Sequence, residues 1–254
     1  MIDLAAGLRR RIEDVIEAVF PTACRRCGHA LPDERAVPRT ARPYAALWNG
    51  QLRRPVCGSW SLPTRLLCGG CAGGLVRSPR AAVLLDGTGL RCVTPFEPTP
   101  VLFELIHAMK YESQVQIAPW FAAFMAAALR GAAGPDSLLV PVPLHARRER
   151  VRGFNQSQLL AAVIARRSGL PLGADLVQRA RDTPAQAQLP HAARHSNLAG
   201  AFRRTGRVPV RGQVVIVDDV VTTGATVAAV AAALDVDPGR VLVTAVCCAR
   251  PGAE

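Results

Sequence analysis

Lysine is almost absent from this chain of 254 residues, which contains one lysine, Lys110, and 30 arginines. Aromatic residues are also scarce, at 5% of the sequence, so a hydrophobic core must be built mainly from aliphatic side chains. The excess of arginine gives a net charge of +12, which favours phosphates, nucleic acid or an anionic surface as partners without choosing among them. Because every other lysine-or-arginine position is an arginine, the single lysine is a candidate functional residue.

The sequence has no hydrophobic run long enough to cross a membrane. Its most apolar stretch, at 117–129, is much shorter than the roughly 20 residues that a transmembrane helix needs. This stretch predicts a buried helix with Pro119 in its first turn. Residues 1–21 place apolar side chains on one helical face and charges on the other, which predicts an amphipathic helix and not a signal peptide. We therefore expect a soluble, cytoplasmic protein with no membrane span.

Four of the eight cysteines form two C-x-x-C pairs, Cys24 with Cys27 and Cys68 with Cys71. Two such pairs can supply the four thiolates of a tetrahedral zinc site. We predict a small zinc-binding module at 22–77, in which structural Zn²⁺ contributes to folding. A disulfide pairing, free thiols, or replacement of one ligand by His29 or Cys57 are the alternatives. The insert at 28–67 is rich in proline, arginine and glycine, and its role stays open.

From residue 78 onward, aliphatic runs alternate with segments of helical periodicity. One or two strands are predicted at 81–96, and further strands at 137–144, 213–219 and 240–250. The predicted helices lie at 100–113, 117–130, 155–169 and 225–235. Asn155 is expected to cap a helix that Gly169 ends. Continuous aliphatic strands that alternate with helices predict a mainly parallel sheet flanked by helices. In an α/β domain of this kind, at 78–254, ligands bind beyond the carboxyl ends of the strands.

The segment VVIVDDVVTTGAT, at 214–226, carries the most specific chemistry. Asp218 and Asp219 follow a buried strand, and the loop after them leads into a helix whose N-terminus can bind an anion. Gly224 lets the backbone approach a ligand closely. Three threonines, Thr222, Thr223 and Thr226, offer hydroxyl groups. Two carboxylates beside a phosphate site need a cation or hydroxyl donors, and a phosphorylated sugar with Mg²⁺ provides both.

This segment resembles the phosphoribosyl-pyrophosphate signature of type I phosphoribosyltransferases. With PVPLHARRERVRGFNQSQLLA, RARDTPAQAQL, RHSNLAGAF and the leading cysteine pairs, it makes the chain similar to the ComF family of competence-associated, phosphoribosyltransferase-like proteins. The resemblance covers residues 22–250 and implies a type I phosphoribosyltransferase-like fold. The insert around Cys57 is longer than the family's usual finger, and Phe96 stands where a tyrosine is common.

The resemblance also implies roles for individual residues. Asp218 and Asp219 become the candidate catalytic residues, which would hold the ribose hydroxyls. The candidate substrate-binding residues are Val221, Thr222, Thr223, Gly224, Ala225, Thr226, Arg148, Arg152, Lys110 and Arg181. The loop residues would surround the 5′-phosphate, and the arginines would stabilise the pyrophosphate leaving group. A solvated basic face is the alternative for the arginines, and a surface position is the alternative for Lys110.

Two functions follow from the resemblance. The first, towards which we lean, is a Mg²⁺-dependent phosphoribosyltransferase with an unknown acceptor, in which residues 178–207 form a mobile flap or else an ordinary hairpin. The second is a non-catalytic competence-type factor that senses phosphoribosyl pyrophosphate, binds single-stranded DNA and works with a DNA-uptake machinery. Trp48, Trp60 and Tyr44 in the insert are candidates for stacking on bases or for the core of the zinc module.

Overall fold

The structure is a computed structural model that describes residues 23–31, 67–78, 82–112, 114–181, 200–208 and 212–249. The predicted helix at 1–21, the aromatic residues of the insert, Cys57 and the middle of the predicted flap lie outside these residues. The chain divides into two compact units. One comprises Met1–Leu75 with Thr99–Leu105, and the other comprises Val76–Pro98 with Ile106–Glu254.

A five-stranded sheet lies at the centre of the second unit, in the order β1-β2-β8-β6-β3. Its strands are β1 (Val83–Leu84), β2 (Arg91–Val93), β3 (Leu138–Pro141), β6 (Val214–Val217) and β8 (Val241–Thr244). Strands β2, β8, β6 and β3 run parallel, and β1 pairs antiparallel with β2 at one edge. Every residue of β3, β6 and β8 is buried, which accounts for their continuous aliphatic sequence. The mainly parallel sheet is thus confirmed.

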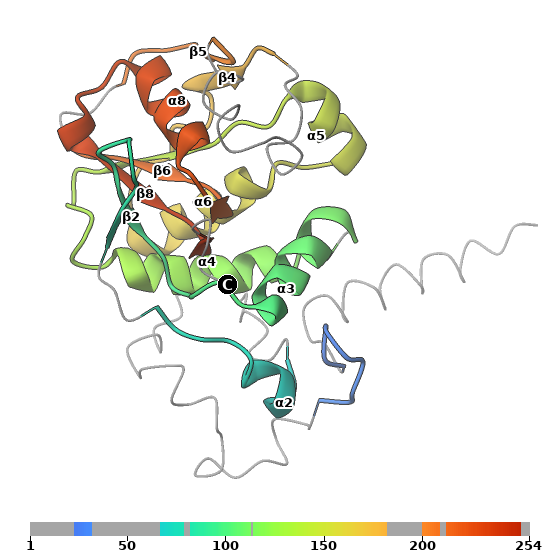
Figure 1. Ribbon diagram of the computed structural model, residues 1–254. Helices are drawn as coiled ribbons and strands as arrows, with labels where there is room; N and C mark the ends of the chain where they lie inside the picture. The colour runs from blue at the N-terminus through green and yellow to red at the C-terminus, as the bar shows by residue number, and fades with distance from the viewer. Residues whose placement is uncertain are drawn as a thin grey trace, which may run out of the picture. The chain divides into compact units, whose positions relative to one another are not determined.

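Helices cover both faces of this sheet (Figure 1). Helix α8 (Ala225–Leu234) packs on one face, and α4 (Ile117–Leu129) and α6 (Gln156–Ser168) pack together on the other. The other helices in the described part of the chain are α2 (Gly69–Ala72), α3 (Pro100–Tyr111), α5 (Ala146–Arg152) and the short 3₁₀ helix η4 (Pro238–Arg240). Most residues of α4 are buried, as its apolar sequence predicts. Among the described residues, no helix combines the length and hydropathy needed to span a membrane.

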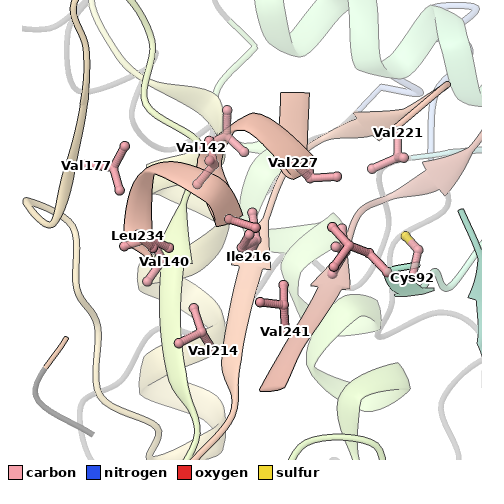
Figure 2. Close-up of a cluster of buried hydrophobic side chains, with 14 of the residues drawn as sticks. Cys92, Val140, Val142, Val177, Val214, Ile216, Val221, Val227, Leu234 and Val241 are labelled. Atoms are coloured by element: carbon pink, nitrogen blue, oxygen red, sulfur yellow. The ribbon is translucent and has the colours of Figure 1, made fainter. Parts of the chain in front are cut away.

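The core under α8 is mainly aliphatic (Figure 2), and Phe202 also belongs to it. Val214 and Ile216 point from β6 toward Val227 and Leu234 of α8, and each of the four is at most 1% exposed. Other aromatic residues gather elsewhere in the second unit. Four of them form one cluster of stacked and edge-on rings, Phe96, Trp120, Phe121 and Phe124.

The sequence predicted both ends of α6 correctly. The side chain of Asn155 caps α6 by accepting a hydrogen bond from the Ser157 amide, and Gly169 ends the helix at a φ of 76°. The strand predicted at 240–250, however, is divided into β8 and β9 (Cys247–Cys248), which belong to different sheets. The division falls at Ala245 and Val246, whose amides donate to Val93 and Asp219.

Two short sheets complete the described part of the fold. Strand β9 pairs in parallel with β7 (Val220–Val221), directly after the two aspartates. Strands β4 (Val177–Arg179) and β5 (Phe202–Arg204) pair antiparallel, so the two ends of the predicted flap are held together. Both Cys92 and Cys247 are completely buried, as expected of small core residues.

Candidate functional site

The two aspartates lie at the carboxyl end of β6, where parallel sheets bind ligands. The amide of Asp218 donates to the carbonyl of Thr244 (3.0 Å), and the carbonyl of Asp219 accepts from the amide of Val246 (2.9 Å). Only 8% of Asp218 and 4% of Asp219 is exposed. The end of β8 therefore holds the backbone of both aspartates in place, with their carboxyl groups buried.

Each carboxyl group has its own set of partners. Oδ1 of Asp218 accepts hydrogen bonds from Ser157 Oγ (3.0 Å) and from the amide of Asp219 (2.9 Å). Oδ2 of Asp219 forms an ion pair with Nζ of Lys110, at the end of α3. The one lysine of the chain is thus the counter-ion of the acidic pair, although it lies more than a hundred residues away in the sequence.

These contacts push the two carboxyl groups toward different charge states. Burial, together with the charge of Asp219, raises the pKa of Asp218 to about 8. Burial acts on Asp219 in the same direction, but the charge and hydrogen bond of Lys110 hold its pKa below the ordinary value. Burial would lower the pKa of Lys110, and the charge of Asp219 raises it instead. Near neutral pH the site therefore holds a protonated Asp218, an ionised Asp219 and a charged Lys110.

The loop after the aspartates leads directly into α8. Gly224 is the N-cap residue and has a φ of 78°, a left-handed conformation that favours glycine. A Cβ at this position would lie 3.1 Å from Leu85 and 3.2 Å from Thr88, so the space is also restricted. Thr223 is buried and its hydroxyl accepts from the amide of Ala225 (3.3 Å). Thr222 and Thr226 are half-buried, which leaves them partly accessible beside the start of the helix.

Helix α5 carries two of the predicted anion-binding arginines, Arg148 and Arg152. The guanidinium of Arg152 donates to Gln156 Oε1 (2.5 Å) and lies 5.0 Å from the centre of the Tyr111 ring. Gln156 is the residue before Ser157, and Tyr111 is the residue after Lys110. Arg152 therefore contacts a sequence neighbour of each residue that binds the acidic pair. Arg181 is exposed and follows β4.

Sequence reasoning missed three residues of this arrangement, Ser157, Gln156 and Tyr111. The segment Asn155–Gln156–Ser157 contains three successive polar residues, all buried, at the start of a helix. Buried polar side chains need hydrogen-bond partners, so their position beside a parallel strand was a usable signal. The pairing of Tyr111 with Arg152 has no comparable sequence signal, because it joins two separate helices.

The first unit brings the two C-x-x-C pairs together. The ligand atoms of Cys24, Cys27, Cys68 and Cys71 all lie within 4.8 Å of one another. A tight turn forms the first pair, with the Gly28 amide donating to the Cys24 carbonyl (2.9 Å), and α2 carries the end of the second pair. Four thiolates about 2.3 Å from a central ion would be roughly 3.8 Å apart, so this spacing fits a zinc ion. Among the described residues, no two cysteines are joined by a disulfide.

Charged and polar groups surround the four sulfur atoms. Arg26 lies with Nη1 3.9 Å from Cys71 Sγ, and Glu104 binds the same guanidinium through two hydrogen bonds. Burial would raise the pKa of Cys24, but backbone amides in the two turns bring it down to about 6. Burial raises the pKa of Cys71 to about 12. His29 lies beside the cluster, with Nδ1 3.8 Å from Cys27 Sγ.

Comparison with known proteins places the chain among bacterial relatives. It is 38% identical to the DNA utilization protein YhgH of Salmonella typhimurium over 184 residues, which cover 70% of this chain and 75% of the relative. The protein of the same name from Escherichia coli is 37% identical with the same coverage. Competence protein F of Haemophilus influenzae is 34% identical over 130 residues, covering 48% of this chain and 56% of the relative.

Family models and solved structures add little to the assignment of the family. No protein-family model matches the chain. Among solved structures, orotate phosphoribosyltransferase from Aeropyrum pernix is 21% identical and covers 67% of this chain and 72% of its own, but the TM-score of 0.27 is too low to carry an argument. The sequence relatives are decisive, because more than a third of the residues are identical over most of both chains. The chain therefore belongs to the ComF family, together with the DNA utilization protein YhgH and Competence protein F.

Proposed function

We propose that this protein binds phosphoribosyl pyrophosphate with Mg²⁺ at the carboxyl end of β6 and transfers the phosphoribosyl group to an acceptor. The observation that carries this proposal is the pair of buried aspartates, followed at once by a glycine- and threonine-containing loop at the start of α8. Ionised carboxylates accept hydrogen bonds from hydroxyl groups, and a helix N-terminus binds phosphate. A sugar that carries both groups fits these two neighbouring features.

Each part of the site has a task in this proposal. Asp218 and Asp219 accept hydrogen bonds from the two ribose hydroxyls, which fixes the orientation of the sugar ring. Residues 221–226 bind the 5′-phosphate through backbone amides and threonine hydroxyls. Arg148 and Arg152 on α5 stabilise the negative charge that develops on the departing pyrophosphate. Lys110 and Arg181 are further cationic contacts for the same anion.

The donor set also fits a hard divalent cation. Mg²⁺ prefers oxygen ligands and is usually held by one or two carboxylates together with the phosphates of the substrate. Asp219, which is ionised near neutral pH, would provide one carboxylate oxygen, and Asp218 would provide a second on losing its proton to solvent. The ion would neutralise pyrophosphate charge, which is the chemistry that a leaving group of this kind needs. The acceptor stays open, because no described residue identifies a nucleobase or an amine.

Isothermal titration calorimetry with phosphoribosyl pyrophosphate and Mg²⁺ tests this proposal. The double variant Asp218→Asn/Asp219→Asn should lose binding while it keeps its fold. A matched control is Asp235→Asn, since Asp235 is exposed at the other end of α8 and has a φ of 56°, which asparagine tolerates. Unchanged affinity in the double variant would overturn the assignment of the site.

A structural zinc ion in the first unit is the second part of the proposal. Cys24, Cys27, Cys68 and Cys71 would hold one Zn²⁺ through four thiolates, and the positive charge of Arg26 would offset part of the negative charge of this site. Metal analysis of freshly purified, reduced protein should find about one zinc per chain. Protein without zinc that still folds normally would contradict the proposal.

Binding to single-stranded DNA is the alternative function. It is favoured by the names of the relatives, which refer to DNA utilization and competence, and by the net charge of +12. In this version the phosphoribosyl-pyrophosphate site has a sensing role, and the protein works with a DNA-uptake machinery. Pyrophosphate release across a panel of nucleobases, measured beside single-strand binding at two salt concentrations, separates the two functions.

A further inference from the structure

Ser157 is a buried hydroxyl group that lies against the acidic pair and has no role in the function proposed above. We infer that Ser157 is a positioning residue that holds Asp218 in one orientation, with Oδ1 turned toward α6 and Oδ2 toward the ligand. This inference rests on the proposed function for its consequence in ligand binding. The orientation itself rests only on the contacts around Asp218.

The two donors to Asp218 meet at the same oxygen atom. Oδ1 accepts from Ser157 Oγ at 3.0 Å and from the amide of Asp219 at 2.9 Å. A backbone amide can only donate, so Oδ1 must be an acceptor in every protonation state. With both of its lone pairs engaged, Oδ1 has no capacity left for a proton or a ligand hydroxyl. Oδ2 is therefore the oxygen that carries the proton when Asp218 is neutral and that meets the ligand when it is ionised.

The hydroxyl of Ser157 is itself held firmly. Ser157 is completely buried in the first turn of α6, and its amide donates to Oδ1 of the capping residue Asn155 (3.0 Å). The Nδ2 group of Asn155 donates in turn to the carbonyl of Val142 (3.1 Å), just after β3. Since β3 and β6 are neighbours in the sheet, this chain of hydrogen bonds fixes the start of α6 relative to Asp218. The serine hydroxyl thus approaches from a rigid support.

The contact has a consequence that a purely structural hydroxyl would not have. Without the Ser157 hydroxyl, one of the two hydrogen bonds that hold Oδ1 is lost, so the carboxyl group of Asp218 becomes free to rotate. A ligand that needs Oδ2 turned toward it would then bind more weakly, and a variant that restores the hydroxyl would restore binding.

The test compares three variants with the unchanged protein. Ser157→Ala removes the hydroxyl, Ser157→Cys keeps the approximate volume but is only a weak donor, and Ser157→Thr restores the hydroxyl. Ser137→Ala is the matched control, because Ser137 is equally buried and its Oγ makes no hydrogen bond in the structure. The first readout is the orientation of the Asp218 carboxyl group in crystal structures of the variants. The second is the affinity for phosphoribosyl pyrophosphate with Mg²⁺ at pH 7.

For Ser157→Ala and Ser157→Cys we expect the Asp218 carboxyl group to lose its single orientation and the affinity to fall about tenfold, as for a lost hydrogen bond. Ser157→Thr and Ser137→Ala should resemble the unchanged protein. An unchanged orientation of Asp218 in both hydroxyl-free variants overturns the inference. If the unchanged protein does not bind phosphoribosyl pyrophosphate, the proposed function fails, and the crystal structures still decide the role of Ser157.

Discussion

Replacing Asp218 with asparagine should change how stability depends on pH. Asparagine resembles the protonated aspartate: its Oδ1 can accept the two hydrogen bonds from Ser157 and the Asp219 amide, and its Nδ2 can donate toward Asp219. The variant should therefore match the unchanged protein at low pH. It should become the more stable of the two as pH rises, because it has no buried group to ionise.

The size of the effect follows from the raised pKa. Asp218 loses its proton near pH 4 in the unfolded chain and at about 8 in the folded protein. Between these values the folded state binds more protons, so stability falls as pH rises, and the loss is complete above pH 8. The slope is about 1.4 kcal/mol per pH unit, so the variant should gain ~3 kcal/mol over the unchanged protein between pH 5 and pH 7. Asp219, with its lowered pKa, contributes in the opposite direction and only in acid.

Urea unfolding followed by circular dichroism measures this difference. Both proteins carry the same histidines and cysteines, so the contributions of those groups cancel when the two curves are subtracted. Asp235→Asn serves as the control, because Asp235 is 85% exposed. A difference between Asp218→Asn and the unchanged protein that stays constant from pH 5 to pH 9 would refute the reasoning about the buried pair.

Three further predictions concern the metal, the loop and nucleic acid. Cys71→Ser should lose bound zinc and destabilise the first unit, whereas Cys248→Ser should retain the metal; equal zinc content in both, by metal analysis, would argue against the four-thiolate site. Gly224→Ala should cost ~1–3 kcal/mol in urea unfolding, because φ is positive and Leu85 leaves little space, and normal stability would contradict this. Binding of single-stranded DNA should weaken with salt, with a log–log slope of roughly −3 if about four phosphates are neutralised, and no binding at low salt would leave the net charge without a nucleic-acid role.

Much of the parallel sheet could be predicted because its signals are local. The aliphatic runs of β3, β6 and β8 are continuous, since both faces of the sheet are covered. Asn155 and Gly169 mark the ends of α6 for reasons of backbone chemistry that act within one turn. The position of Asp218 and Asp219 at a strand end followed from the same pattern.

The contacts within the site could not be predicted in the same way. Lys110 meets Asp219, and Ser157 meets Asp218, only because separate strands and helices assemble around β6. The division between β8 and β9 was also missed, because it depends on hydrogen bonds from Ala245 and Val246 to Val93 and Asp219, which are distant in the sequence. The composition singled out Lys110 as the one lysine of the chain, but only the fold identified Asp219 as its partner. The division into a helix at 1–21, a zinc module at 22–77 and an α/β domain at 78–254 stays a prediction.

A crystal structure of the protein with phosphoribosyl pyrophosphate and Mg²⁺ tests the central claim most directly. The account predicts the ribose hydroxyls within hydrogen-bond distance of Asp218 and Asp219, and the 5′-phosphate against residues 222–226 at the start of α8. A ligand bound elsewhere would contradict the account. So would the absence of bound ligand at saturating concentration, with Lys110 still paired with Asp219.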